Sequence, residues 1–116
     1  QLNLAEKFLQ SLGQDINQRL EVLTEVLGRA IGQTATQQAL TLVTDWQNLM
    51  RDLILLKLSQ PQLVQHQPLL ASLTKQAERC KISDLLKWQA ALRQAKDYLR
   101  DNVNPRLALE SVMINF

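Results

Sequence analysis

The stretch TQQALTLVTDWQNLMRDLILLKL, residues 36–58, decides the fold. Its apolar side chains recur at helical spacing over an arc of about 200°, against about 100° for an ordinary surface helix. We therefore predict a long central helix that other helices cover from more than one side. Leu55 projects on the polar side of this helix, beside Asn48 and Arg51. The apolar positions are Ala39, Leu40, Leu42, Val43, Trp46, Leu49, Met50, Leu53, Ile54, Leu56 and Leu58.

Turn residues and apolar periodicity divide the rest of the chain into shorter helices. Asn104 is expected to cap the last one, and Pro105 suits its first turn. This last helix is apolar on nearly every side, which predicts that it docks in a groove. Ser83 is expected to cap the helix before it. Residues 1–13 suit either a first helix or a linker. The expected helices span residues 4–12, 15–30, 68–80, 83–101 and 106–116, with a loop over residues 59–67.

The composition favours a single all-α domain of five or six helices over residues 1–116. The 116 residues include 24 Leu and 15 Gln, which are good helix formers, but only three Gly and three Pro. Aromatic residues make up 4% of the chain. An all-β sandwich needs more turn residues and more β-branched and aromatic residues than this.

Several classes of function are excluded by what the sequence lacks. No stretch approaches 18 consecutive apolar residues, so no transmembrane helix is expected. One His and one Cys are too few for a structural zinc site, and the three glycines do not have phosphate-loop spacing. We expect no cofactor, no metal and no small-molecule substrate. The chain begins with Gln1 rather than Met, which indicates a domain of a longer protein.

The candidate catalytic groups have simpler structural explanations. Glu21 and Glu25 lie one turn apart, but on the solvated face of a predicted helix. His66 lies in a Gln-rich loop without an evident Ser, Cys or Asp partner, which favours a surface histidine. Cys80 stands between two cations that would lower the pKa of its thiol, yet its place at a helix end favours an unreactive group. We predict that the chain is not an enzyme.

Two motifs remain, WQNLMRDLILLK at residues 46–57 and NVNPRLALE at residues 102–110. Together, in this order, they resemble the carboxy-terminal domain of bacterial DNA polymerase III clamp-loader subunits, and the second is similar to the last helix of the delta-prime subunit. About 100° separates Arg51 and Asp52 on a helix, so we expect these two side chains to reach different neighbours. The motif residues are Trp46, Arg51, Asp52, Lys57, Asn102, Asn104, Pro105, Arg106 and Glu110.

This resemblance implies a helical collar domain. In the family, collar domains of the delta, gamma/tau and delta-prime subunits pack into a ring that holds the loader pentamer together, in the bacterial cytoplasm, for sliding-clamp loading during DNA replication. The ATP-binding modules of such subunits precede the collar, and none is present in this sequence. The implied function is therefore non-catalytic subunit assembly, with gamma/tau and delta subunits as partners.

The predicted surface supports two function hypotheses. Leu55 and Leu86 project on polar arcs, which favours a protein interface with the stripe Arg93, Lys96 and Arg100 at its rim. The same three cations would alternatively give a helical module that binds nucleic acid weakly and in a salt-sensitive way. The net charge of +2 is small, and no aromatic side chain interleaves with the stripe, so the sequence favours the protein interface.

Overall fold

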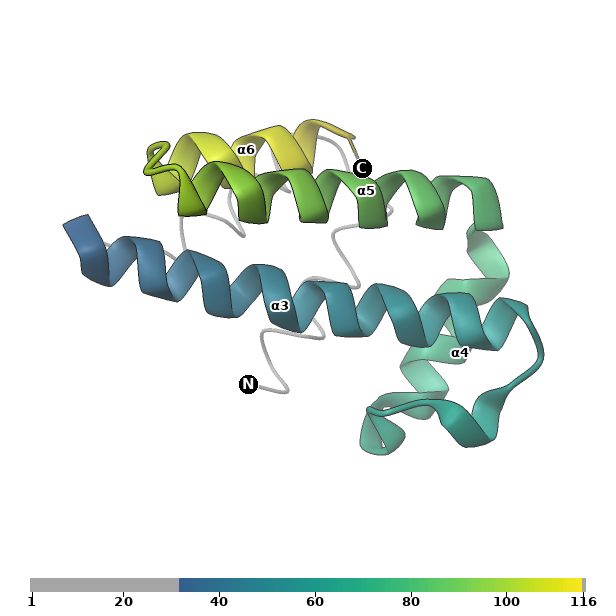
Figure 1. Ribbon diagram of the computed structural model, residues 1–116. Helices are drawn as coiled ribbons and strands as arrows, with labels where there is room; N and C mark the ends of the chain where they lie inside the picture. Colours follow the sequence, from purple (N-terminus) through teal and green to yellow (C-terminus); the bar gives the residue numbers. More distant parts are fainter. Residues whose placement is uncertain (1–31, 116) are drawn as a thin grey trace.

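The computed structural model describes residues 32–115, with side chains for residues 34–114. No strand occurs among these residues, so the predicted all-α class is confirmed. The expected helices over residues 4–12 and 15–30, and Glu21 and Glu25 with them, lie outside the described residues. The helices, numbered as in Figure 1, are α3 (Gly32–Lys57), α4 (Leu70–Arg79), α5 (Ile82–Arg100) and α6 (Pro105–Asn115), and two 3-10 turns, η1 (Pro61–Leu63) and η2 (Gln67–Leu69), join α3 to α4.

The longest described helix, α3, packs against α4, α5 and α6. Figure 1 shows α5 running back alongside α3 in the opposite direction, and α6 reversing again to lie along α5. The short helix α4 lies near the end of α3 and leads up to the start of α5. Because α5 and α6 are antiparallel neighbours, the short loop over residues 101–104 suffices between them, whereas η1, η2 and α4 lie between α3 and α5.

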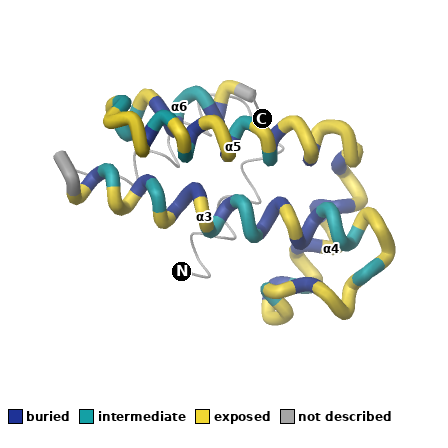
Figure 2. The backbone as a smooth tube through the Cα atoms, viewed as in Figure 1, coloured by how far each residue is buried: buried dark blue, intermediate teal, exposed yellow. Residues whose placement is uncertain are grey.

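The core between α3 and α5 follows a seven-residue pattern on both helices. On α5 the positions Leu85, Leu92 and Leu99 are at most 1% exposed, with Trp88 and Ala95 buried between them. Figure 2 shows buried and exposed positions alternating along α3. Such alternating spacings of three and four residues keep one stripe of a helix against its neighbour. Truncating one of these leucines to alanine costs about 2–5 kcal/mol of stability. The matching positions on α3 are Ala39, Val43, Trp46, Met50 and Leu53.

The helix starts differ from the sequence expectations in three places. Helix α3 begins at Gly32, four residues earlier than predicted, and Pro68 lies in η2 rather than in α4. Helix α5 begins at Ile82, and its N-cap residue Lys81 makes no side-chain capping hydrogen bond. The prediction that Ser83 caps this helix is therefore wrong, because Ser83 lies inside the first turn, where the backbone carbonyl of Lys81 accepts the first amides.

The helices α3 and α5 both end in a Schellman motif without glycine. After α3, Ser59 has a φ of 60°, its N–H donates to the Leu56 carbonyl at 3.0 Å, and the Gln60 N–H donates to the Leu55 carbonyl at 2.9 Å. After α5, Asn102 has a φ of 64°, and the Val103 N–H donates to the Tyr98 carbonyl at 2.9 Å. This left-handed conformation favours glycine, and asparagine tolerates it better than serine. The chain therefore reverses direction twice in a sequence that has few glycines.

Candidate interaction surface

The first motif builds the inside of the fold. Trp46 is 2% exposed on α3, and the side chain of Asp52, six residues further, is fully buried. The Asp52 carboxylate lies against the loop between α3 and α4. Its Oδ1 accepts the Gln65 N–H at 2.9 Å, and its Oδ2 accepts the His66 N–H at 3.0 Å and contacts His66 Nδ1 at 2.6 Å. We call this set of contacts the Asp52 clasp.

The Asp52 clasp corrects the interpretation of His66 as a surface histidine without an acidic partner. The His66 imidazole is about three-quarters buried, and its Nδ1 is the third group that contacts the buried Asp52 carboxylate. A buried carboxylate is tolerated only when donors replace its water shell, and charge-assisted bonds of this length are strong. The loop supplies these donors, so the clasp fixes the path of the chain from α3 to α4.

Arg51 and Lys57, the two cations of the first motif, are exposed at the surface. Arg51 Nη1 lies 3.9 Å from Asp52 Oδ1, while 54% of its side chain is exposed, so this ion pair contributes at most about 1 kcal/mol. The expectation that Arg51 and Asp52 reach different neighbours is therefore only partly met, because Asp52 reaches the loop and Arg51 reaches Asp52 and solvent. Lys57 lies in the last turn of α3, where its positive charge interacts favourably with the helix dipole.

The second motif joins α5 to α6. Asn102 occupies the left-handed position described above, and Pro105 is the first residue of α6. The Asn104 side-chain oxygen accepts the N–H groups of Arg106 at 2.9 Å and Leu107 at 3.2 Å, which confirms the predicted cap. Arg106 Nε donates to Glu110 Oε2, one turn further along α6, at 3.3 Å. The motif therefore fixes the reversal between two helices.

Leu55, expected to be an exposed interface residue, is partly buried and packs against the core. Both α4 and η1 contact α3, so the end of α3 has neighbours on more sides than its apolar arc indicates. Leu86, by contrast, is 55% exposed on α5. The structure therefore separates the two leucines that the sequence placed together.

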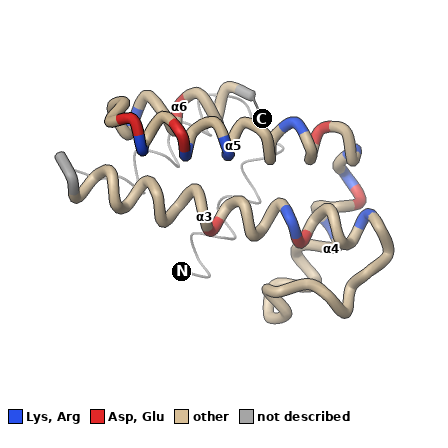
Figure 3. Tube along the Cα trace, in the orientation of Figure 1, with Lys and Arg blue, Asp and Glu red and all other residues tan. Residues whose placement is uncertain are grey.

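The exposed side of α5 combines apolar and charged residues on one continuous face. Every third or fourth residue along it is exposed, first apolar and then charged, and charges of both signs occur along α5 (Figure 3). Lys96 is not on this side, because it is half-buried towards α3 and its Nζ lies 3.5 Å from Gln47 Oε1. The predicted stripe of three cations is therefore reduced to two. We call this surface the α5 outer face: Ile82, Leu86, Ala90, Arg93, Asp97 and Arg100.

Helix α6 is covered on one side rather than on every side. Ala108, Leu109 and Val112 are at most 1% exposed, but Leu107 and Ile114 are 61% and 62% exposed. Helix α6 does pack against both α5 and α3, but among the described residues the expected coverage of all its sides is not found. Helix α6 lies along α5 at the edge of the bundle, where only one of its sides faces other described helices (Figure 1).

Cys80 is buried at the end of α4, and the pKa of its thiol is raised above the ordinary value of 9.0. Burial is the main cause, and Asp84 adds to it, whereas Lys57 acts in the opposite direction. The net lowering of the pKa expected from the flanking cations is therefore not found, because desolvation outweighs the opposing effect of Lys57. The prediction of an unreactive thiol agrees with this environment.

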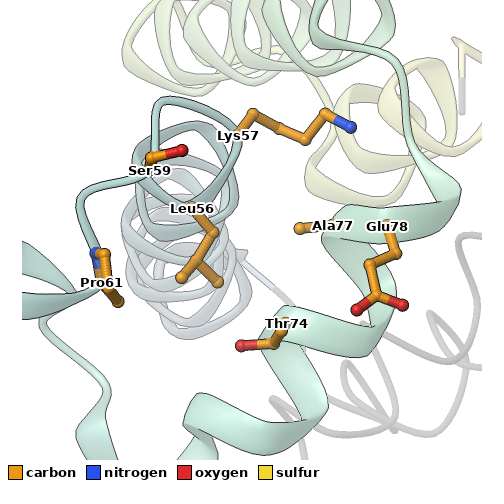
Figure 4. A pocket seen from close by; sticks show the side chains of 7 residues that line it. All are labelled: Leu56, Lys57, Ser59, Pro61, Thr74, Ala77 and Glu78. Carbon is orange, nitrogen blue, oxygen red and sulfur yellow. The ribbon is translucent and has the colours of Figure 1, made fainter.

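A depression of about 540 Å³ lies between the end of α3 and α4. Figure 4 shows Leu56 and Ala77 facing it from the two helices, with Lys57 and Glu78 further out along its border. The other lining residues are Ser59, Pro61 and Thr74. None of these residues belongs to the α5 outer face.

Comparison with protein-family models, with curated proteins and with solved structures finds no match to this chain. Among residues 32–115, no three His, Cys, Asp or Glu side chains group closely enough to hold a metal ion. No helix in this part of the chain combines the length and the apolar character needed to cross a bilayer. The class of protein that the fold defines is an all-α helical domain.

Proposed function

We propose that this chain is a non-catalytic subunit-assembly domain, a collar domain of a bacterial DNA polymerase III clamp loader that is most like delta-prime. It would pack against gamma/tau and delta subunits in the bacterial cytoplasm and hold the loader together. The observation that carries the proposal is the structural role of the two motifs at residues 46–57 and 102–110. Their buried or capping residues build the fold, as expected for a domain whose task is to present a surface rather than to catalyse a reaction.

The α5 outer face supports the same proposal. It places two large aliphatic side chains, Ile82 at 38% and Leu86 at 55% exposure, on the same face of α5 as the exposed charges of Arg93, Asp97 and Arg100. An apolar centre beside charged residues is the usual anatomy of a protein–protein interface. Leu107 and Ile114 on α6 add a second exposed apolar pair, about 10 Å apart along that helix.

Nucleic-acid binding is the second candidate. Arg93 and Arg100 favour it because both are exposed and neither pairs with an acid among residues 32–115. Against it, Lys96 is turned towards Gln47, and Asp97 stands between the two arginines on the same face. The face therefore has a net charge of only +1 and adjoins the exposed apolar side chains of Ile82 and Leu86, so we favour the protein partner.

Co-purification with gamma/tau and delta collar domains tests the proposal. We expect the wild-type chain to assemble with them and Leu86→Glu to lose at least about tenfold in affinity, because a charge is poorly tolerated in a desolvated interface. Leu63→Glu is the matched control, since Leu63 is 52% exposed on η1, away from α5. Failure of the wild-type chain to assemble would contradict the proposed function.

A further inference from the structure

The α5 outer face has a polarity along its length. Its first three positions, Ile82, Leu86 and Ala90, are apolar, and its last three are Arg93, Asp97 and Arg100. Leu86 and the two arginines are seven residues apart in turn, so they project at nearly the same angle from α5, about 10 Å apart along its axis. The whole face is about 27 Å long.

The two arginines of the α5 outer face, Arg93 and Arg100, are available to a partner. Both are exposed, and neither makes an ion pair within the described part of the chain. The one exposed acid of the face, Asp97, leaves a net charge of +1. Carboxylates at two points one heptad apart on a partner would pair with both arginines, and an α-helix provides that spacing by itself.

The apolar half selects against a nucleic acid. Ile82 and Leu86 offer aliphatic surface without an aromatic ring, whereas single strands are held by stacking on aromatic side chains. One helix turn separates them, which is the spacing at which an amphipathic helix presents its own apolar side chains.

We propose that the α5 outer face binds an acidic amphipathic helix of a neighbouring protein chain. Apolar side chains of that helix cover Ile82, Leu86 and Ala90, and its carboxylates pair with Arg93 and Arg100. The proposal rests on the proposed function, because it states the chemistry of the assembly partner at this surface.

Two synthetic helical peptides of 21 residues test it. Both carry leucines at i and i+4, followed at intervals of seven residues by Glu in one peptide and by Lys in the other. We expect the wild-type chain to bind the Glu peptide at least about tenfold more tightly than the Lys peptide, with a preference that falls as salt is added. Fluorescence anisotropy of labelled peptides measures both affinities.

The double variant Arg93→Glu/Arg100→Glu should reverse this preference. Lys75→Glu/Arg79→Glu makes the same change in charge on exposed positions of α4 and should keep the wild-type preference. Circular dichroism checks that both variants remain folded. Equal binding of the two peptides to the wild-type chain overturns the proposal, and so does tighter binding of a single-stranded oligonucleotide than of the Glu peptide.

Failure here and failure of the proposed function are distinguishable. A chain that assembles with gamma/tau and delta collar domains but shows no charge preference contradicts only the acidic-helix proposal. A chain that ignores those subunits while the double variant reverses its peptide preference contradicts only the collar proposal.

Discussion

At the scale of single residues, Asp52 shows what one buried carboxylate can organise. It accepts two backbone N–H groups and contacts one imidazole nitrogen, all from residues 65 and 66. Deleting the carboxylate would leave these part-buried polar groups without their acceptor, and each group that water cannot reach costs about 1–3 kcal/mol. The exposed Arg51 next to it carries no such penalty.

We therefore expect Asp52→Ala to lower the free energy of unfolding by about 2–4 kcal/mol. His66→Ala should cost less, about 1 kcal/mol, because both backbone donors keep their acceptor. Arg51→Ala is the control and should change stability by under about 0.5 kcal/mol. Urea denaturation followed by circular dichroism gives the three values. An Asp52→Ala chain as stable as the Arg51→Ala chain would show that the clasp does not support the fold.

At the scale of elements, the helix ends determine where the chain turns. The two Schellman motifs place Ser59 and Asn102 in the left-handed region that glycine occupies without steric cost. Asparagine is the commoner substitute for glycine there, whereas serine is not. The left-handed conformation therefore costs more free energy at Ser59, after α3, than at Asn102, after α5.

This difference predicts that Ser59→Gly raises the free energy of unfolding by about 0.5–1 kcal/mol, because it relieves the Cβ clash at a φ of 60°. Asn102→Gly should gain less, since Asn already tolerates this conformation. Ser59→Ala retains the Cβ and should bring no gain, which makes it the control. Midpoints of thermal unfolding are sufficient for the comparison, and equal effects of Gly and Ala at position 59 would refute the steric argument.

At the scale of the whole molecule, the sequence predicted the class of fold because apolar periodicity and a shortage of turn residues are strong, local signals. It also predicted the Asn104 cap, which depends only on neighbouring residues. The Asp52 clasp could not be located, because an acid inside an apolar run indicates a buried partner without naming it. Leu55, Leu107 and Ile114 were misjudged because exposure depends on which helices become neighbours.

The stability of the molecule should also depend on alkaline pH through Cys80. Burial raises the pKa of this thiol, so the folded chain holds the proton more tightly than the unfolded chain does. The stabilisation is complete below about pH 9 and is lost as the pH rises through the raised pKa. Between about pH 8 and pH 11, the free energy of unfolding should therefore fall more for the wild type than for Cys80→Ala, which has no thiol. Urea unfolding at each pH measures both values. Parallel profiles for the two chains would contradict this assignment.

The buried leucines and the outer face share one helix and one seven-residue period. Leu85, Leu92 and Leu99 are each followed immediately by Leu86, Arg93 and Arg100. Insertion of a single residue within α5 would rotate everything beyond it by about 100°, so the inner and outer sides would be displaced together. Insertion of a full heptad would restore the phase of both and lengthen the helix by about 10 Å. The buried side of α5, which packs in the core, and the α5 outer face, which is open to a partner, therefore share one helical phase.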